Sequence, residues 1–246
     1  MKLIDIHSHI LPAVDDGSKN IATSIKLLEM MKEQGITDVV ATPHFIASEQ
    51  SLEEHISNIN AAKAELEAAV CGMELPNIYL GSEVYYFKGI GRSDGIRKLS
   101  LNGSQYLLLE LPMYEISEKI AEDVRNISYN LGLTPILAHI ERYHREKGFK
   151  KVLKLIESGC CYAQINTSSL FIPPLKRTVR KLIKKGYVSF IATDTHSPDH
   201  RPPLMKEALR ALETDFGREY KREMLMNLDS VCREITDEKA EMKFEF

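Results

Sequence analysis

The sequence predicts an α/β fold built around a parallel β-sheet. Short apolar runs of strand length alternate with amphipathic stretches of helix length, which is typical of repeated β-α units. Seven strands can be counted in this way, and a chain of 246 residues suits one domain of the α/β barrel type or two smaller domains. No linker is long or biased enough to divide the chain, so we expect one domain over residues 1–246.

The expected elements follow from apolar periodicity and from the residues that end it. Ile21, Ile25 and Leu28 recur at helical spacing, and Gly35 marks the end of that helix. We expect strands at residues 2–6, 38–41, 78–80, 106–111, 134–138, 162–165 and 188–192. We expect helices at residues 20–34, 52–70, 117–131, 150–158, 175–185, 203–214 and 218–228.

Two connections carry strong turn signals. Pro43 follows the second strand and disfavours a helix before it. Three glycines, Gly89, Gly91 and Gly95, lie between the third and fourth strands. We therefore expect an irregular, glycine-rich connection there.

Composition argues against several classes of protein. The formal net charge is −3, and without a basic excess a nucleic-acid partner is not expected. No apolar run approaches the roughly 18 residues that span a bilayer, and no signal peptide is visible. The four cysteines form no C-x-x-C pair, so we expect reduced thiols in a cytoplasmic protein.

Histidines and acidic residues gather at the ends of the expected strands. His7 and His9 leave the first strand two residues apart, so both imidazoles can face one metal ion. Other candidates follow later strands: His44, Glu83, Glu110, His139, Asp194 and His196. Any one of them alone could be a loop residue, an ion-pair partner or a helix cap. Together, in a parallel barrel, they would meet at one rim and would need cations to offset their burial. His55, inside a polar helix, is expected to be solvated.

These motifs resemble the polymerase-and-histidinol-phosphatase (PHP) superfamily. The matching segments are His7-x-His9, Thr42-Pro43-His44, Gly81-x-Glu83, His139-x-Glu141-Arg142 and Asp194-x-His196. The stretch from Asp5 to Gly17 is similar to the bacterial metal-dependent tyrosine-protein phosphatases of the capsule and exopolysaccharide type (CpsB/YwqE-like). The resemblance covers residues 3 to about 215 and implies a distorted (β/α)7 TIM-like barrel of PHP type. Ile140 departs from that family, which usually has proline there.

The resemblance also implies three divalent metal ions. One would be held by His7, His9 and Asp194, and a second by Glu83, Glu110 and His139, with Glu83 bridging the two. A third would be held by His44 and His196, with Asp15 as a further candidate ligand. Ligands that mix imidazole and carboxylate suit manganese, iron or zinc, and manganese is the expected ion.

Two arginines complete the expected site. Arg142 and Arg201 follow His139 and His196 closely, and a guanidinium group binds phosphate with two parallel hydrogen bonds. The resemblance places substrate-binding arginines at both positions, although Arg142 could instead pair with Glu141 or another loop carboxylate. The expected reaction is in-line attack on a phosphomonoester by a metal-bridging hydroxide.

The cysteine-based mechanism of other tyrosine phosphatases can be excluded. It needs an arginine six positions after a cysteine, and those positions hold Asn77, Asn166, Thr167 and Glu238. A run of aromatic residues, Tyr85-Tyr86-Phe87, could form a wall for a phenyl ring or could belong partly to the core.

Substrate identity stays open at this level. The resemblance implies a phosphotyrosine protein, the tail of a membrane-associated tyrosine autokinase that governs polysaccharide export. The alternatives are a small-molecule PHP phosphatase, such as a histidinol-phosphatase, and a module in which metal ions serve only structure.

Overall fold

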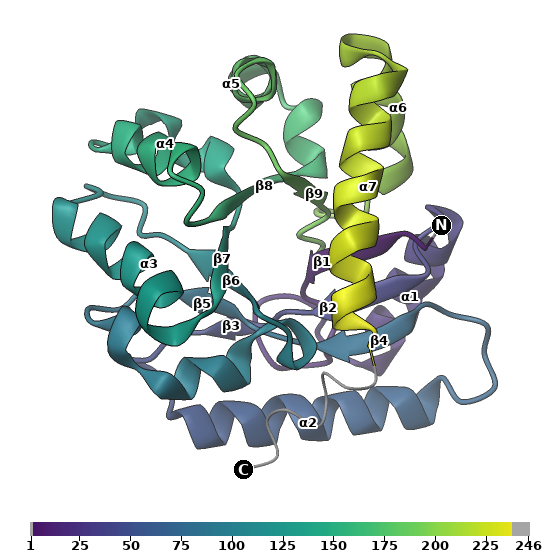
Figure 1. Cartoon of the computed structure of the whole chain (residues 1–246). Coiled ribbons are helices and arrows are strands. Elements are labelled where there is room, and N and C mark those ends of the chain that lie inside the picture. Colours follow the sequence, from purple (N-terminus) through teal and green to yellow (C-terminus); the bar gives the residue numbers. More distant parts are fainter. Residues whose placement is uncertain (1, 238–246) are drawn as a thin grey trace.

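The parallel strands form a ring with helices outside it (Figure 1). The computed structural model describes residues 2–237. The strands are β1 (Ile4–Ser8), β2 (Asp38–Ala41), β3 (His44–Phe45), β4 (Asn77–Leu80), β5 (Glu83–Tyr85), β6 (Tyr106–Glu110), β7 (Thr134–Leu137), β8 (Tyr162–Asn166) and β9 (Phe190–Ala192). Every paired neighbour runs parallel, which confirms the α/β prediction.

The last strand returns to the first. Beyond the end of β9, Asp194 N donates to His7 O at 2.9 Å, and His9 N donates to Thr195 O at 2.9 Å. Ser8 and Thr195 form a parallel bridge at the same place. The strands form two sheets, with the orders β1-β2-β4 and β3-β5-β6-β7-β8-β9. The contacts between β1 and the segment after β9 close these sheets into a distorted barrel.

Two strands of the ring are interrupted. The line of β2 breaks at Thr42 and Pro43 and resumes as β3, because proline has no N–H to offer a neighbouring strand. The line of β4 breaks at Gly81 and Ser82 and resumes as β5. The nine strand segments in residues 2–237 therefore correspond to the seven strands that the sequence predicted, because β2 with β3 and β4 with β5 each form one interrupted strand.

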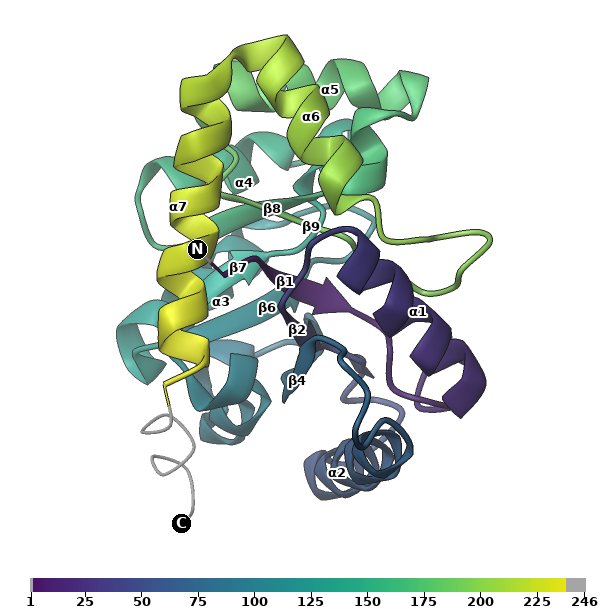
Figure 2. The same ribbon diagram turned by 90° about the vertical axis from the view of Figure 1, so that its right-hand side faces the viewer.

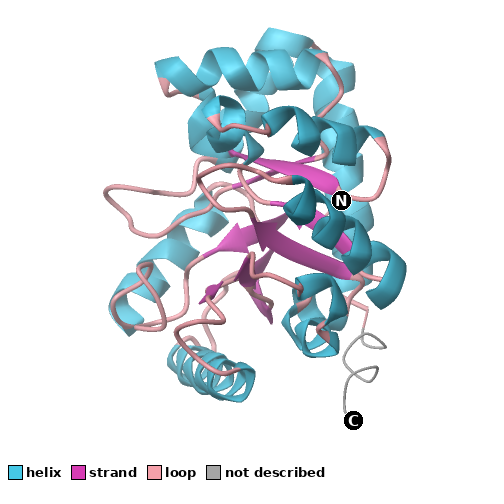
Figure 3. Cartoon of the chain, turned by 90° about the vertical axis from the view of Figure 1, so that its left-hand side faces the viewer, coloured by secondary structure: helices cyan, strands magenta, loops and turns pink. Residues whose placement is uncertain are grey.

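Helices surround the strands on their outer side (Figures 2 and 3). They are α1 (Ile21–Glu33), α2 (Leu52–Ala69), α3 (Glu118–Leu131), α4 (Phe149–Glu157), α5 (Pro173–Lys184), α6 (Met205–Phe216) and α7 (Arg218–Ile235). Asn20 caps α1, and Ser51 with Glu54 forms a capping box at α2. The last helix extends beyond the predicted residue 228 because Val231, Cys232 and Ile235 continue its buried stripe.

Short 3₁₀ helices account for what periodicity did not predict. Three of them, Ile90–Arg92, Asp94–Leu99 and Leu101–Gly103, fill the glycine-rich connection. Two more, Ile140–Arg145 and Thr167–Leu170, follow β7 and β8. Such pieces have too few residues to show an apolar period.

The core is apolar and continuous from the strands to the inner faces of the helices. Ile4, Ile6, Leu107, Leu109 and Ile165 are fully buried. Among residues 2–237, no helix combines the length and apolar character needed to cross a membrane.

Candidate metal centre

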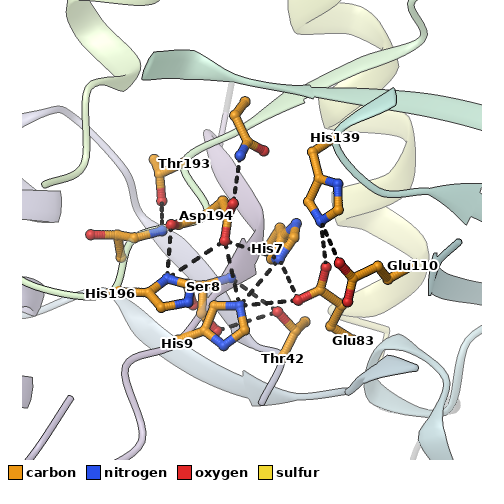
Figure 4. A network of polar contacts seen from close by, with 12 residues as sticks. His7, Ser8, His9, Thr42, Glu83, Glu110, His139, Thr193, Asp194 and His196 are labelled. Atoms are coloured by element: carbon orange, nitrogen blue, oxygen red, sulfur yellow. Dashed lines mark hydrogen bonds and ion pairs between the residues drawn. The ribbon is translucent and has the colours of Figure 1, made fainter. Parts of the chain in front are cut away.

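His7 in β1 and His9 just after it face the same point at the carboxyl end of the strands. Their Nε2 atoms lie 3.2 Å apart, and both side chains are fully buried (Figure 4). His7 Nδ1 lies 3.3 Å from Gln164 Oε1, and His9 Nδ1 lies 2.6 Å from Asp15 Oδ2. An amide or carboxylate oxygen can only accept, so each Nδ1 is protonated and each Nε2 is the nitrogen that faces the cluster.

His196 is oriented in the same way from the other side of the site. Its Nδ1 lies 3.0 Å from the backbone oxygen of Asp194, so Nε2 carries the free lone pair. That nitrogen lies 3.3 Å from Asp16 Oδ1. Outer acceptors that fix the tautomer of a histidine are characteristic of metal ligands.

Glu83 lies at the centre of the cluster, at the first position of β5. Its Oε2 is 3.2 Å from His7 Nε2, 3.3 Å from His9 Nε2 and 3.1 Å from His44 Nδ1. Its Oε1 is 2.9 Å from His139 Nε2. The carboxylate is almost completely buried. Burial would raise its pKa, but the surrounding histidines hold the pKa well below the usual value.

Asp194 separates the histidines from two arginines. Its Oδ1 lies 3.4 Å from His7 Nε2 and 3.5 Å from His9 Nε2. Its Oδ2 accepts from Arg142 at 2.7 Å, from Asn166 at 2.5 Å and from Arg201. The Asp194 carboxylate therefore contacts both the buried histidines and the two arginines predicted to bind phosphate.

Glu110 is the carboxylate with the least compensation. Its Oε1 lies 3.6 Å from His139 Nε2. Burial and the neighbouring charge of Glu83 raise the pKa of Glu110 to about 7. Two carboxylates around one imidazole repel each other, and a bound cation would relieve that repulsion.

The loop after β1 contributes two aspartates with different roles. Asp15 is nearly buried, and its pKa is lowered to about 2 because bonds from His9 and from Gly17 N outweigh the effect of burial. Asp16 is 68% exposed, and its Oδ1 lies 3.4 Å from His44 Nε2 and 3.3 Å from His196 Nε2. Gly17 is required here, since a Cβ would collide with the backbone of His9.

Three groups of side chains in residues 2–237 can each surround a metal ion. They are His9, Asp16, His44 and His196; His7, His9 and Asp194; and His44, Glu83 and Glu110. Within each group the ligand atoms lie within 4.8 Å of one another. The histidine lone pairs and carboxylate oxygens converge with few donors to satisfy them, so the residues present fit divalent cations. Asp15 belongs to none of these groups and instead holds His9.

Two candidate ligands have unusual backbone geometry. His139 has φ 34° and Asp194 has φ 51°, which is the left-handed region that residues with a Cβ rarely adopt. His139 lies two residues after the end of β7, and Asp194 lies two residues after the end of β9. Strain of this kind concentrates at functional sites, where the surrounding structure fixes a side chain in one direction.

Several supporting residues could not be recognised from the sequence. Glu141 is fully buried and accepts from Asn166 N at 3.1 Å and from Ser169 Oγ at 2.6 Å, so it holds the segment after β8. Gln164 and Asn166 on β8 orient His7 and Asp194. An amide in a strand carries no distinctive signal, and only its neighbours in space reveal its role.

The expectation that His55 is solvated was wrong. His55 is fully buried, and its Nε2 lies 2.7 Å from Ser82 Oγ, beside Glu83. The ring also packs edge-on against Phe45, and burial lowers its pKa to about 4. Polar residues on both sides of His55 in α2 concealed this inward position.

The cluster opens into a pocket of about 280 Å³. Its walls include Ile46, Tyr85, Arg142 and Arg201, beside the candidate ligands. Of the aromatic run, Tyr85 lines this pocket, whereas the Tyr86 hydroxyl donates to Asp123 Oδ2 at 2.8 Å. Phe87 packs against the core, so the run divides between pocket and core.

Comparison with known proteins places this geometry in a family. The sequence profile described as capsular polysaccharide synthesis, CpsB/CapC, matches residues 3–231. The chain belongs to the CpsB/CapC family. The tyrosine-protein phosphatase CpsB of Streptococcus agalactiae is 33% identical over 94% of this chain and 98% of its own. YwqE of Bacillus subtilis, also named a tyrosine-protein phosphatase, is 30% identical over 95% of this chain and 93% of its own.

Solved structures agree with this assignment to the CpsB/CapC family. A crystal structure described under YwqE of Bacillus subtilis and CpsB of Streptococcus pneumoniae, as metal-dependent tyrosine phosphatases, superposes with a TM-score of 0.77. It is 26% identical and covers 94% of this chain and 95% of its own. A histidinol phosphate phosphatase of Lactococcus lactis has a TM-score of 0.53 at 14% identity over 88% of this chain and 95% of its own, which shows a shared fold alone.

Proposed function

We propose that this chain is a metal-dependent protein-tyrosine phosphatase that acts as a single PHP-type phosphoesterase domain. The observation that carries the proposal is the orientation of three histidines. His7, His9 and His196 each use Nδ1 on an outer acceptor and present Nε2 to the same cluster. Two arginines adjoin that cluster at Asp194, as a phosphate-binding site requires.

Three divalent ions are proposed, with manganese as the expected metal and iron or zinc as alternatives. The first would be held by His7, His9 and Asp194. The second would be held by Glu83, Glu110 and His139, with Glu83 shared with the first. The third would be held by His44, His196 and Asp16. The distances of Asp16 to both histidines favour it over Asp15 as this ligand.

When bound, such ions make hydroxide available near neutral pH and offset the negative charge of a phosphomonoester. The protein itself orients the side chains that would bind these ions. Gln164 holds His7 and Asp15 holds His9, so Nε2 of each ring faces the site before any ion or substrate arrives. This preorganisation reduces the rearrangement that catalysis would otherwise require.

Arg142 and Arg201 would bind the phosphate oxygens. Their side chains are 33% and 37% exposed, and both line the pocket while reaching Asp194. A guanidinium group that donates to one carboxylate oxygen still has other N–H groups that can donate to a second anion. The phosphate of a substrate at the pocket mouth would accept hydrogen bonds from both arginines.

The walls suit an aromatic phosphate ester. Tyr85 and Ile46 are the apolar-bodied residues that line the pocket beside its charged residues. A phenyl ring attached to the bound phosphate would contact the face of Tyr85. Asp16 at the mouth is 68% exposed, so the site is shallow on that side and can accept a phosphotyrosine carried on a peptide.

The proposed substrate is a tyrosine autokinase, associated with the membrane, that controls capsular and exopolysaccharide synthesis. Support comes from the family description, which refers to capsular polysaccharide synthesis, and from relatives named tyrosine-protein phosphatases. We place the reaction in the cytoplasm. Free thiols at Cys71, Cys160, Cys161 and Cys232 suit a reducing compartment.

Comparative turnover tests the proposal. With manganese supplied, phosphotyrosyl peptides should be hydrolysed with higher kcat/KM than phosphoseryl peptides or histidinol phosphate. Tyr85→Ala should raise KM for the phosphotyrosyl peptide severalfold, because it removes the aromatic contact. Tyr86→Phe, which changes a residue bonded to Asp123 outside the pocket, is the matched control. Preference for histidinol phosphate would instead establish a small-molecule phosphatase.

A further inference from the structure

A second cavity lies on the flank of the barrel, between α2, the end of β4 and the 3₁₀ helices before β6. Its volume is about 370 Å³, larger than that of the pocket at the metal centre. Figure 1 shows α2 passing alongside β4 at this place. The lining contains none of the candidate metal ligands.

The charge of this cavity has one sign. Arg97 and Lys98 line it, and none of the residues that line it is acidic. The closest competitor is Asp94, whose Oδ1 lies 4.0 Å from Arg97 Nε, at the outer limit of an ion pair. The Arg97 side chain is 37% exposed, so most of its donors remain available for an anion.

A buried serine also borders the cavity. Ser100 is 2% exposed and lines the cavity, and its Oγ has no hydrogen-bond partner among the described residues. A buried polar atom without a partner costs about 1–3 kcal/mol, so such an atom often marks a place where a ligand or water binds. The amide of Asn60 borders the same space.

The lining of the cavity also has apolar residues. Ile56, Ile59 and Leu80 line it, and Ile59 is nearly buried. A pocket lined by both cationic and aliphatic side chains matches a ligand with an acidic group and a compact apolar body.

We infer that this cavity is a binding site for a small organic anion, in which Arg97 and Lys98 receive the acidic group and Ile56, Ile59 and Leu80 contact the apolar body. Gly81 also lines the cavity, two residues before Glu83. An occupant would therefore contact the connection that carries the central carboxylate of the metal centre. The inference is independent of the proposed phosphatase activity.

The test uses the fluorescent probe 1-anilinonaphthalene-8-sulfonate, an aromatic sulfonate, with the full-length metal-loaded protein. We expect one bound probe per chain and enhanced fluorescence. Arg97→Glu/Lys98→Glu should weaken binding by about tenfold or more, because the cavity then repels an anion. Asn60→Phe, which fills the mouth from α2 without changing charge, should also weaken it severalfold.

Controls separate this site from nonspecific attraction. Lys88→Glu/Arg92→Glu makes the same change in net charge on exposed residues that do not line the cavity, and it should leave binding unchanged. The neutral relative N-phenyl-1-naphthylamine should bind more weakly and respond little to Arg97→Glu/Lys98→Glu. Equal binding of the sulfonate to wild type and to both cavity variants would overturn the inference, as would equal loss in the Lys88→Glu/Arg92→Glu control.

Discussion

The Nδ1 atom of His9 lies 2.6 Å from Oδ2 of Asp15, which turns His9 Nε2 toward Glu83 and Asp194. Asp15 thereby contacts the candidate metal centre through a histidine, whereas the Asp16 carboxylate lies 3.4 Å from His44 Nε2 and 3.3 Å from His196 Nε2. The two adjacent aspartates should respond differently to the same substitution.

Asp15→Asn should weaken metal affinity by about 10–100-fold at the His9 site without removing a ligand, which is the usual effect of losing an outer carboxylate. Asp16→Asn should lower the number of bound ions by one per chain, because it removes a ligand of the proposed third ion. Metal analysis after dialysis against graded chelator concentrations distinguishes these results. Identical ion counts and affinities for both variants would contradict the assignment.

Arg142→Ala should retain metal and lose about 10²-fold in kcat/KM, since it removes a donor to the charge that develops on phosphate. Arg145→Ala is the matched control, because Arg145 is exposed on the same 3₁₀ helix. Steady-state kinetics and metal analysis would be measured together. Unchanged kcat/KM in Arg142→Ala would show that the arginine serves only Asp194.

His55→Phe should destabilise the fold by about 1–3 kcal/mol, because it leaves the buried hydroxyl of Ser82 without its partner. Adding Ser82→Ala should recover part of that loss, since both polar groups are then absent. Urea unfolding of the two single variants and the double variant measures the coupling. Strict additivity would mean that the 2.7 Å contact contributes nothing.

Asp123→Asn should lower stability at neutral pH and have little effect in acid. Burial raises the pKa of Asp123, but donors from Gly89 N, Tyr86 and Lys119 outweigh it and the pKa is lowered. A lowered carboxyl pKa stabilises the fold above the unfolded value of about 4 and loses that contribution as the pH falls through the native value. Thermal unfolding of both proteins from pH 7 to pH 3 should show their Tm values converging. Parallel curves would contradict this account.

The strands and most helices could be predicted because apolar periodicity depends on burial, which the fold then imposes. The clustering of the candidate metal ligands could be predicted because strand-end residues of parallel strands share one rim. The proposed choice of Asp16 over Asp15 could not be made from the sequence, since it depends on a turn around Gly17 that packs against His9. The position of His55 was missed because its partner, Ser82, lies 27 residues away in the sequence.

The left-handed backbone at His139 and Asp194 affects how these positions should be probed. Alanine there would remove a donor atom and also occupy a conformation that alanine disfavours, so a loss of activity would mix two causes. Asparagine tolerates this conformation far better. An asparagine scan of both positions would separate what the side chain contributes to chemistry from what the residue contributes to the shape of the chain.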